Sequence, residues 1–262
     1  MKRDLLKIFL NEKVDFYNQP SFINADPICI PHFFTKKQDI EISGFFAAIF
    51  SWGNRATIIN KSKELLTLMN NSPCEFILHH QKKDLKKLEG FKHRTFNTTD
   101  LLYCIEFFKY HYSKNDSLEN AFTRWMHKKD KTVENGLNGF YKYFFSLPHI
   151  PERTKKHIAA PNKNSSCKRL NMFLRWMVRN DNKGVDFGIW KNISPVQLVM
   201  PIDVHVARVA KQFNLLQQNK IDWQAALELT QYLRTLDAAD PVKYDFALFS
   251  MGVLETPKPF RK

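Results

Sequence analysis

The stretch PNKNSSCKRLNMFLRWMVR (residues 161–179), followed by VMPIDVHVARVAKQFNL (residues 199–215), decides the fold class. In the first, a polar turn leads into apolar residues at helical spacing, which predicts a helix from Lys168 to Arg179. In the second, an extended Pro-Ile pair leads to Asp203 at the position of a helix N-cap. A second helix is therefore predicted from Val204 to Phe213.

Helical periodicity dominates the rest of the chain as well. Residues 39–68 predict one or two helices, interrupted at SWGNR (51–55), where Gly53 is suited to a turn. The other predicted helices are an opening segment around Leu5–Phe9, one that starts at Ser72-Pro73, and residues 100–112, 118–128, 135–146, 152–160, 223–236 and 244–253. Strand character is confined to short isolated runs such as 28–30, so the chain is predicted to be all-α.

Residues 152–179 are interpreted as a helix–hairpin–helix. Successive backbone N–H groups in such a hairpin, and the N-terminus of its second helix, bind phosphate with the help of nearby cations. The residues expected to contact DNA here are Lys163, Asn164, Ser165, Ser166 and Arg169.

The charge balance favours a polyanionic partner. Forty Lys and Arg against 26 Asp and Glu leave a net charge of +14. Such an excess attracts nucleic acid first and an anionic membrane surface second. The alternative is a solvated basic surface that has no partner.

The cysteines and the apolar runs exclude several classes of protein. Cys29, Cys74, Cys104 and Cys167 are scattered without a C-x-x-C pair, so no iron–sulfur cluster, other cofactor or metal is expected. No apolar run is long enough to span a membrane, and the N-terminal apolar stretch is too short for a signal peptide. A reducing bacterial cytoplasm is the expected compartment, with the protein on the nucleoid when it is bound to DNA.

The segment at 199–215 resembles the Pro-x-Asp-x-His segment of the helix–hairpin–helix DNA glycosylase superfamily, which includes endonuclease III and the 8-oxoguanine glycosylases. The resemblance implies that Lys168 is the nucleophile and Asp203 the catalytic carboxylate. FFAAIFSWGNRATIINKSKELL (45–66) is similar to the family's early helix pair, which places Asn54 and Arg55 near the gap left by a flipped base. YDFALFSMG (244–252) resembles the family's late helix that ends in Gly.

The chain departs from the superfamily at the hairpin. The usual pattern is Pro-Gly-x-Gly-x-Lys, whereas here both glycines are absent and the hairpin is two residues longer. Lys168 and Asp203 are 35 positions apart, an arrangement closer to the archaeal 8-oxoguanine glycosylases. More narrowly, residues 165–179 with 186–191 and 201–206 resemble an uncharacterised bacterial family of unknown function, DUF2400.

The resemblance implies two interleaved helical lobes with a cleft between them. We expect an N-terminal segment (1–40) packed with the C-terminal lobe, a central lobe (41–203) and a C-terminal lobe (204–262). The expected activity is excision of a damaged base, for example an oxidised purine, from double-stranded DNA by a monomer. A Lys Schiff base forms, an Asp stabilises the sugar cation, and lyase cleavage follows. Candidates for the base pocket are Met172, Phe187 and Trp190.

One alternative to catalysis stays open at this level. Lys168 and Asp203 can serve simply as a phosphate contact and a helix cap. The protein is then a non-catalytic module that binds DNA or structured RNA.

Overall fold

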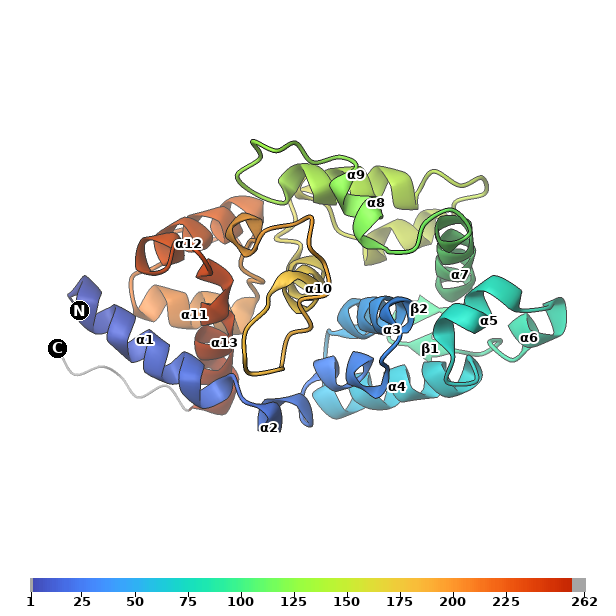
Figure 1. Ribbon diagram of the computed structural model, residues 1–262, viewed down its shortest axis with the longest axis horizontal. Helices are drawn as coiled ribbons and strands as arrows, with labels where there is room; N and C mark the ends of the chain where they lie inside the picture. The colour runs from blue at the N-terminus through green and yellow to red at the C-terminus, as the bar shows by residue number, and fades with distance from the viewer. Residues whose placement is uncertain (1, 256–262) are drawn as a thin grey trace. The chain divides into compact units, whose positions relative to one another are not determined.

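The computed structural model describes residues 2–255 (Figure 1), and helices make up most of them. The α-helices are α1 (Arg3–Tyr17), α2 (Pro20–Ile23), α3 (Lys37–Phe50), α4 (Arg55–Leu68), α5 (Pro73–His79), α6 (Lys82–Lys86), α7 (Thr98–Tyr112), α8 (Glu119–Thr123), α9 (Glu134–Phe144), α10 (Lys168–Val178), α11 (Val204–Gln212), α12 (Trp223–Leu236) and α13 (Asp245–Leu254). Short 3-10 helices are η1 (Pro27–Cys29), η2 (Pro31–Phe33), η3 (Glu152–His157), η4 (Pro161–Lys163), η5 (Pro195–Gln197) and η6 (Pro241–Tyr244). Strands β1 (Lys92–His93) and β2 (Phe96–Asn97) pair antiparallel. The prediction of a mostly helical chain is confirmed.

The chain divides into two compact units. The first unit contains the residues before 23, residues 130–133 and the residues after 159, and the second unit contains residues 23–129 and 134–159. The predicted lobe boundaries at residues 40 and 203, and the cleft between lobes, stay predictions. Residues 256–262 of the predicted C-terminal lobe lie outside the described residues.

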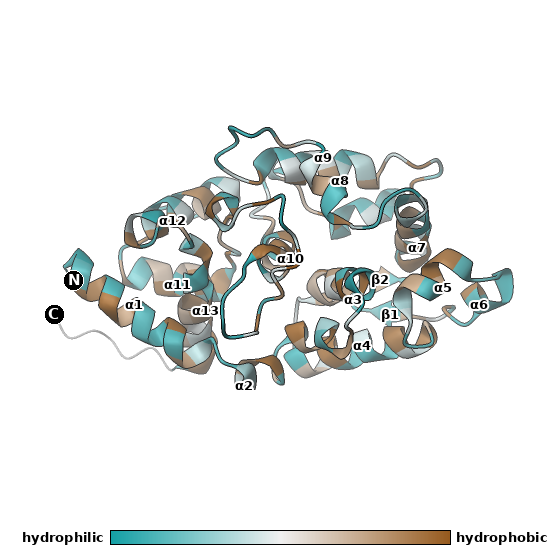
Figure 2. Ribbon diagram, viewed as in Figure 1, coloured by the Kyte–Doolittle hydropathy of each residue, from teal (hydrophilic) through white to brown (hydrophobic). Residues whose placement is uncertain are grey.

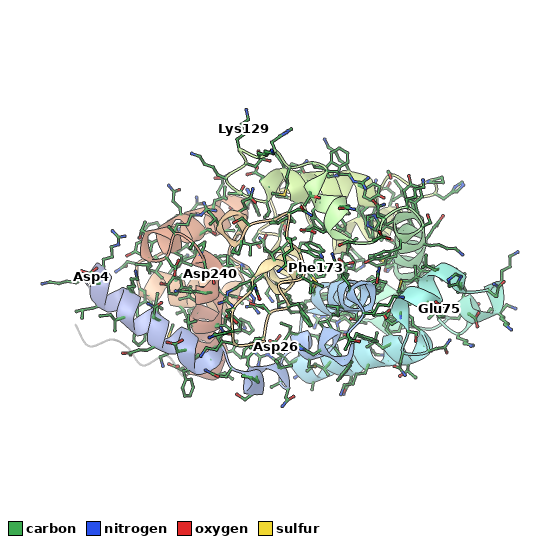
Figure 3. All side chains as sticks on the ribbon, in the orientation of Figure 1. Asp4, Asp26, Glu75, Lys129, Phe173 and Asp240 are labelled. Carbon is green, nitrogen blue, oxygen red and sulfur yellow. The ribbon has the colours of Figure 1, made fainter. Side chains whose placement is uncertain are left out.

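The first unit is built around α13. This helix packs against α11 and α1, and nearly all of its residues from Asp245 to Gly252 are buried. Polar and apolar residues alternate along α1, whose Leu6, Leu10 and Val14 are buried (Figure 2). On α10, Phe173 lies in the core and packs edge-on against Trp190, with ring centroids 5.4 Å apart (Figure 3). The unit therefore has its own apolar core.

The second unit has a phenylalanine-rich core. Every residue of α3 from Ile40 to Phe50 is buried, and the Phe45 ring packs edge-on against Phe108 at 5.1 Å. Glu41 is buried in this core, yet its carboxylate accepts hydrogen bonds from the Tyr112 hydroxyl (2.9 Å) and the Leu118 N–H (3.0 Å). The buried charge is thus hydrogen-bonded, as stability requires.

A second buried carboxylate, Asp100, joins two elements of this unit. Its oxygens accept hydrogen bonds from the Asn97 N–H (2.9 Å) and the Thr154 hydroxyl (2.7 Å), and it pairs with Arg153. The His157 ring lies 3.3 Å from the same carboxylate. Asp100 therefore closes a capping box at the start of α7 and fastens η3 to it.

The structure corrects two predicted elements. The strand-like run 28–30 lies in and just after η1, between Pro27 and Pro31, whose rings fix φ at values that suit a 3-10 turn. The predicted helix 152–160 is the 3-10 helix η3, and Ile158 and Ala160 are extended. Ala160 precedes Pro161, and a residue before proline is pushed out of the helical region. The first arm of the predicted helix–hairpin–helix is therefore not an α-helix.

No helix within residues 2–255 combines the length and the apolar character needed to cross a bilayer.

Candidate active site

The hairpin before α10 turns without glycine. Asn164 (φ 54°) and Cys167 (φ 52°) both adopt the left-handed conformation that glycine usually supplies. Asn tolerates this conformation better than most residues, and the Cys167 side chain is fully buried, so packing holds it there. Asn164 and Cys167 thus make the left-handed turns before α10 without glycine.

Hydrogen bonds tie this hairpin to the segment that carries Asp203. The Ser166 hydroxyl donates to the Ile202 carbonyl at 3.3 Å, and the Asn171 amide donates to the Ser166 carbonyl at 3.0 Å. The first bond joins the hairpin to the residue before Asp203, and the second joins it to α10. Lys168, the first residue of α10, is consequently fixed beside Asp203.

Lys168 and Asp203 form an ion pair within the first unit. Lys168 Nζ lies 3.8 Å from Asp203 Oδ2, and the two side chains are 20% and 24% exposed. Both side chains are therefore partly accessible to solvent and lie close enough to contact the same small group.

The two oxygens of Asp203 have different partners. Oδ1 accepts hydrogen bonds from the backbone N–H groups of His205 (2.9 Å) and Val206 (3.0 Å), which caps α11. Oδ2 is the oxygen that faces Lys168. Capping leaves one oxygen available, so the capping role and a role beside the lysine are compatible.

A thioether and an aromatic ring lie close to the amine. The Met172 sulfur, one turn along α10, is 3.5 Å from Lys168 Nζ. The Phe249 ring on α13 has its centroid 5.6 Å from the same nitrogen, and this side chain is half-buried. An aromatic ring and a thioether beside an amine suit the binding of a flat apolar group.

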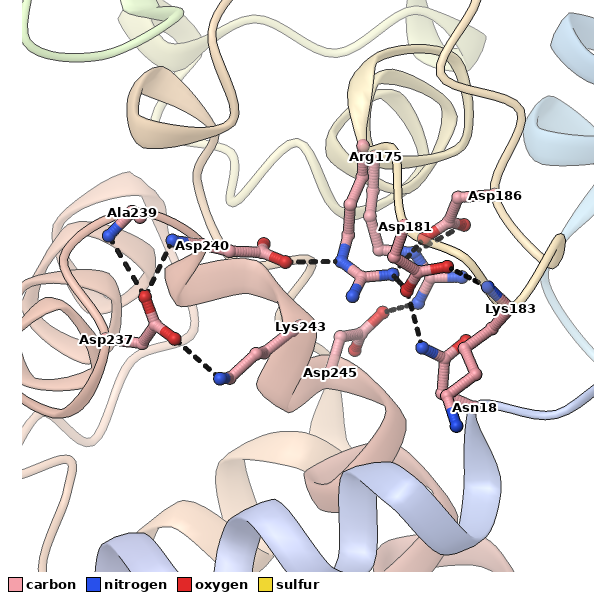
Figure 4. Close-up of polar contacts among 11 residues, drawn as sticks. Asn18, Arg175, Asp181, Lys183, Asp186, Asp237, Ala239, Asp240, Lys243 and Asp245 are labelled. Carbon is pink, nitrogen blue, oxygen red and sulfur yellow. Dashed lines mark hydrogen bonds and ion pairs between the residues drawn. The ribbon is translucent and has the colours of Figure 1, made fainter.

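Asp245, at the start of α13, is a buried carboxylate near the pair. Burial raises its pKa to about 6, with Asp203 and Asp186 adding to the effect, while Arg175 and Lys168 oppose it. It forms an ion pair with Arg175, which is on α10 (Figure 4). A carboxyl with such a pKa changes its charge in the weakly acidic range.

Arg179 holds the other end of the same network. Its guanidinium contacts Asp181 (2.7 Å), Asp186 (3.0 Å) and Asp240 (2.8 Å). Burial alone would lower the pKa of Arg179, and these carboxylates raise it above its ordinary value. Asn18 donates to Asp181 at 2.7 Å, so α1, α10 and the loop after α10 are joined by one set of charges (Figure 4).

The other predicted residues of this unit lie in different surroundings. Lys163 and Asn164 are exposed, Ser165, Ser166 and Arg169 are half-buried, and burial lowers the pKa of the Arg169 guanidinium. Trp190 is 1% exposed and contributes to the core beside Phe173, while Phe187 is half-buried. Of the three predicted pocket residues, the structure brings Met172 to the lysine.

Asn54 and Arg55 belong to the second unit. Asn54 Oδ1 accepts a hydrogen bond from the Thr57 N–H at 3.1 Å, which caps α4. Arg55 is the first residue of α4 and is half-buried.

In the part of the chain that the structure describes, no group of three or more His, Cys, Asp or Glu residues could hold a metal ion. Cys29, Cys74, Cys104 and Cys167 are buried, and none of these four forms a disulfide bond.

Comparison with known proteins assigns a family. The family model described as "Protein of unknown function (DUF2400)" matches residues 26–254. The chain belongs to the DUF2400 family. The narrower resemblance seen in the sequence is thereby confirmed. No curated protein and no solved structure matches the chain, so a link between this DUF2400 chain and the glycosylases depends on its residues alone.

Sequence reasoning missed Phe249 and Asp245 as members of the site. Both are on α13 and are four residues apart, the spacing that puts two side chains on one helix face. That spacing was the available signal. The spacing did not by itself indicate a site, because an acid in the first turn of a helix and a Phe in an apolar helix each have an ordinary structural explanation.

Proposed function

We propose that this protein is a DNA glycosylase with lyase activity that excises a damaged base, for example an oxidised purine. A single observation carries the proposal. Lys168, at the first position of α10, has its amine 3.8 Å from Asp203 Oδ2, and both side chains remain partly open to solvent. An amine and a carboxylate so arranged are the two groups that the reaction needs.

The chemistry assigns one role to each group. The Lys168 ammonium first gives up a proton to solvent, and the neutral amine attacks the anomeric carbon. The N-glycosidic bond breaks, and its electron pair leaves with the base, which takes up a proton. Positive charge develops on the sugar, and the Asp203 carboxylate stabilises it. The amine then loses a proton, the sugar ring opens to a Schiff base, and elimination of the 3′ phosphate cleaves the strand.

The surroundings of the amine support a base pocket. A base must leave the duplex before it can be attacked, and a flipped base is held by stacking. Met172 and Phe249 offer surfaces within 3.5 Å and 5.6 Å of the amine. In this proposal Lys163, Asn164, Ser165 and Ser166 contact the DNA backbone beside the Lys168–Asp203 pair.

One observation favours a second function. The cap that Asp203 provides to α11 explains that residue without any catalysis. The alternative is a non-catalytic module that binds DNA or structured RNA through the hairpin and its cations.

Borohydride trapping separates the two. The wild type is incubated with duplexes that carry different base lesions, and a covalent protein–DNA adduct is sought after reduction. Lys168→Gln should abolish the adduct. Lys243→Gln is the matched control, since Lys243 also pairs with an aspartate in the first unit and is 19% exposed. If the wild type forms no adduct with any lesion but still binds DNA, the binding-module function replaces the enzymatic one.

A further inference from the structure

A tight turn and a hairpin meet in the second unit, outside the candidate active site. The turn that follows α3 contains Trp52 and Gly53, with Gly53 at φ 109°. The hairpin pairs Lys92 with Asn97 and His93 with Phe96, which leaves Arg94 and Thr95 as its two turn residues. The His93 ring donates to the Phe50 carbonyl at 3.0 Å, and this bond joins the hairpin to the end of α3.

Arg94 is held in a strained backbone conformation at an exposed position. Its φ is 55°, a value that costs a non-glycine residue about 1 kcal/mol or more. Hairpin turns of two residues prefer Asn or Gly there. The Arg153 guanidinium donates to the Thr95 carbonyl at 2.9 Å and fixes the turn from its other side. The arginine is therefore presented by a rigid support.

The Arg94 guanidinium stacks on Trp52 and has all its donors free for a ligand. Its central carbon lies 4.4 Å from the Trp52 ring centroid. A Cβ on Gly53 would come within 2.6 Å of Arg94 Nη1, so the close approach depends on glycine. Within residues 2–255, Arg94 makes no ion pair and donates no hydrogen bond. Five N–H donors in a fixed plane suit a phosphate, which accepts two of them at once.

A second arginine, Arg124, also stacks on an aromatic ring but is hydrogen-bonded within the protein. The Arg124 guanidinium lies 4.3 Å from the Tyr143 ring centroid and is also exposed. Its Nε donates to the Asn120 carbonyl at 2.9 Å, and its Nη2 donates to Asn115 at 3.4 Å. Stacking therefore does not by itself leave an arginine without hydrogen bonds. At Arg94, by contrast, the guanidinium makes no hydrogen bond within residues 2–255.

We propose that Arg94, stacked on Trp52, is a phosphate contact for duplex DNA in the second unit. The neighbouring cation Lys92 is exposed and, among the described residues, makes no ion pair of its own. A phosphate can thus meet two positive charges on one hairpin. The inference rests on the proposed function only in its choice of DNA as the polyanion.

The test measures binding to a short undamaged duplex over a series of salt concentrations. Arg94→Gln should weaken binding about tenfold and lower the salt slope by about one unit, since one phosphate contact is lost. Trp52→Leu keeps the charge and removes the support, so it should weaken binding about threefold with nearly the same slope. Arg124→Gln removes an equal charge and an equal stacking contact, and should leave binding close to that of the wild type.

Equal losses in Arg94→Gln and Arg124→Gln, or no loss in Arg94→Gln, overturn the inference. Absence of duplex binding by the wild type overturns it as well. Undamaged DNA makes this test independent of Lys168. Trapping of a lesion without an effect of Arg94 leaves the proposed function intact, and an effect of Arg94 without trapping leaves the phosphate contact intact.

Discussion

At Asp203, one carboxylate serves two neighbours through its two oxygens. Oδ1 receives the two N–H groups at the start of α11, and Oδ2 faces the amine of Lys168. An N-cap requires an acceptor oxygen and no charge, whereas stabilisation of a sugar cation requires the charge. Substitution by the isosteric amide can therefore separate the two roles.

Asp203→Asn should melt like the wild type, because Asn caps a helix as well as Asp does. It should nevertheless slow base release about 10²- to 10³-fold, the usual effect of losing one preorganised electrostatic group. Single-turnover base release and melting temperature are measured together. The matched control is Asp222→Asn, since Asp222 caps α12 through the N–H groups of Gln224 and Ala225. If Asp203→Asn releases base at the wild-type rate, Asp203 serves only as the N-cap of α11.

The buried carboxyl of Asp245 makes stability depend on pH in a defined range. Its pKa is about 6 in the folded chain and 3.8 in its ordinary state. Between these values the folded state binds the proton more tightly, so the stability that this carboxyl contributes is greatest below pH 3.8. It is lost as the pH rises through about 6.

Asp245→Asn should remove that loss, because an amide does not titrate. The free energy of unfolding of the wild type, relative to that of the variant, should fall between about pH 4 and pH 6 and then level off. Denaturant unfolding at a series of pH values measures this difference. Asp237→Asn should give a difference of the opposite sign that appears as the pH falls below 3.8, since hydrogen bonds and the charge of Lys243 lower the pKa of Asp237 against the effect of burial. A constant difference for Asp245→Asn across the range contradicts the prediction.

Among the helices, the contact between α11 and α13 positions the candidate site. Asp203 begins α11, and Asp245 and Phe249 are on α13. The two helices approach closely at Gly252, where a Cβ would lie 2.9 Å from the His205 carbonyl oxygen and 3.0 Å from its Cβ. Neither atom can move unless α11 moves, so this glycine sets the distance between the helices.

Gly252→Ala should destabilise the protein by about 1–3 kcal/mol, the usual cost of overpacking. It should also lower the rate of borohydride trapping, because a shift of α11 moves Asp203 relative to Lys168. Gly136→Ala on α9 is the control. Its new Cβ meets the flexible Met126 side chain at 3.0 Å, which can yield, and alanine favours the helix. Equal stability of the two variants would show that the helices tolerate the added methyl group.

Local signals predicted the long helices well and the short elements poorly. Helix α12 has the predicted bounds 223–236 because Asp222 caps it and its apolar residues keep helical spacing. No local sequence pattern predicted the hairpin at 92–97. Its strands are two residues long and depend on contacts with the end of α3 and with Arg153. The pairing of Lys168 with Asp203 was predicted from the resemblance to a known family. The distance between the two side chains could be obtained only from the three-dimensional structure.

Across the whole molecule, the net charge of +14 makes salt the decisive variable for binding. Lys129 illustrates the exposed cations, with its side chain extended away from the ribbon (Figure 3). If about four phosphates are neutralised, log K for duplex DNA should fall with log salt at a slope of about −3.6. Fluorescence anisotropy at several salt concentrations measures this slope. If the affinity for DNA does not change with salt concentration, the net positive charge does not contribute to DNA binding.

The alternation of the two units along the chain has a consequence for biosynthesis. Residues 23–129 and 134–159 leave the ribosome before α10 to α13 exist, so the second unit can fold while the chain is still being made. Helix α1 is made first, yet its packing partner α13 is made more than 200 residues later. During that interval Leu6, Leu10 and Val14 have no core to enter. The apolar face of α1 is thus exposed until α13 has been made, a period in which a chaperone can bind a surface that the folded unit covers.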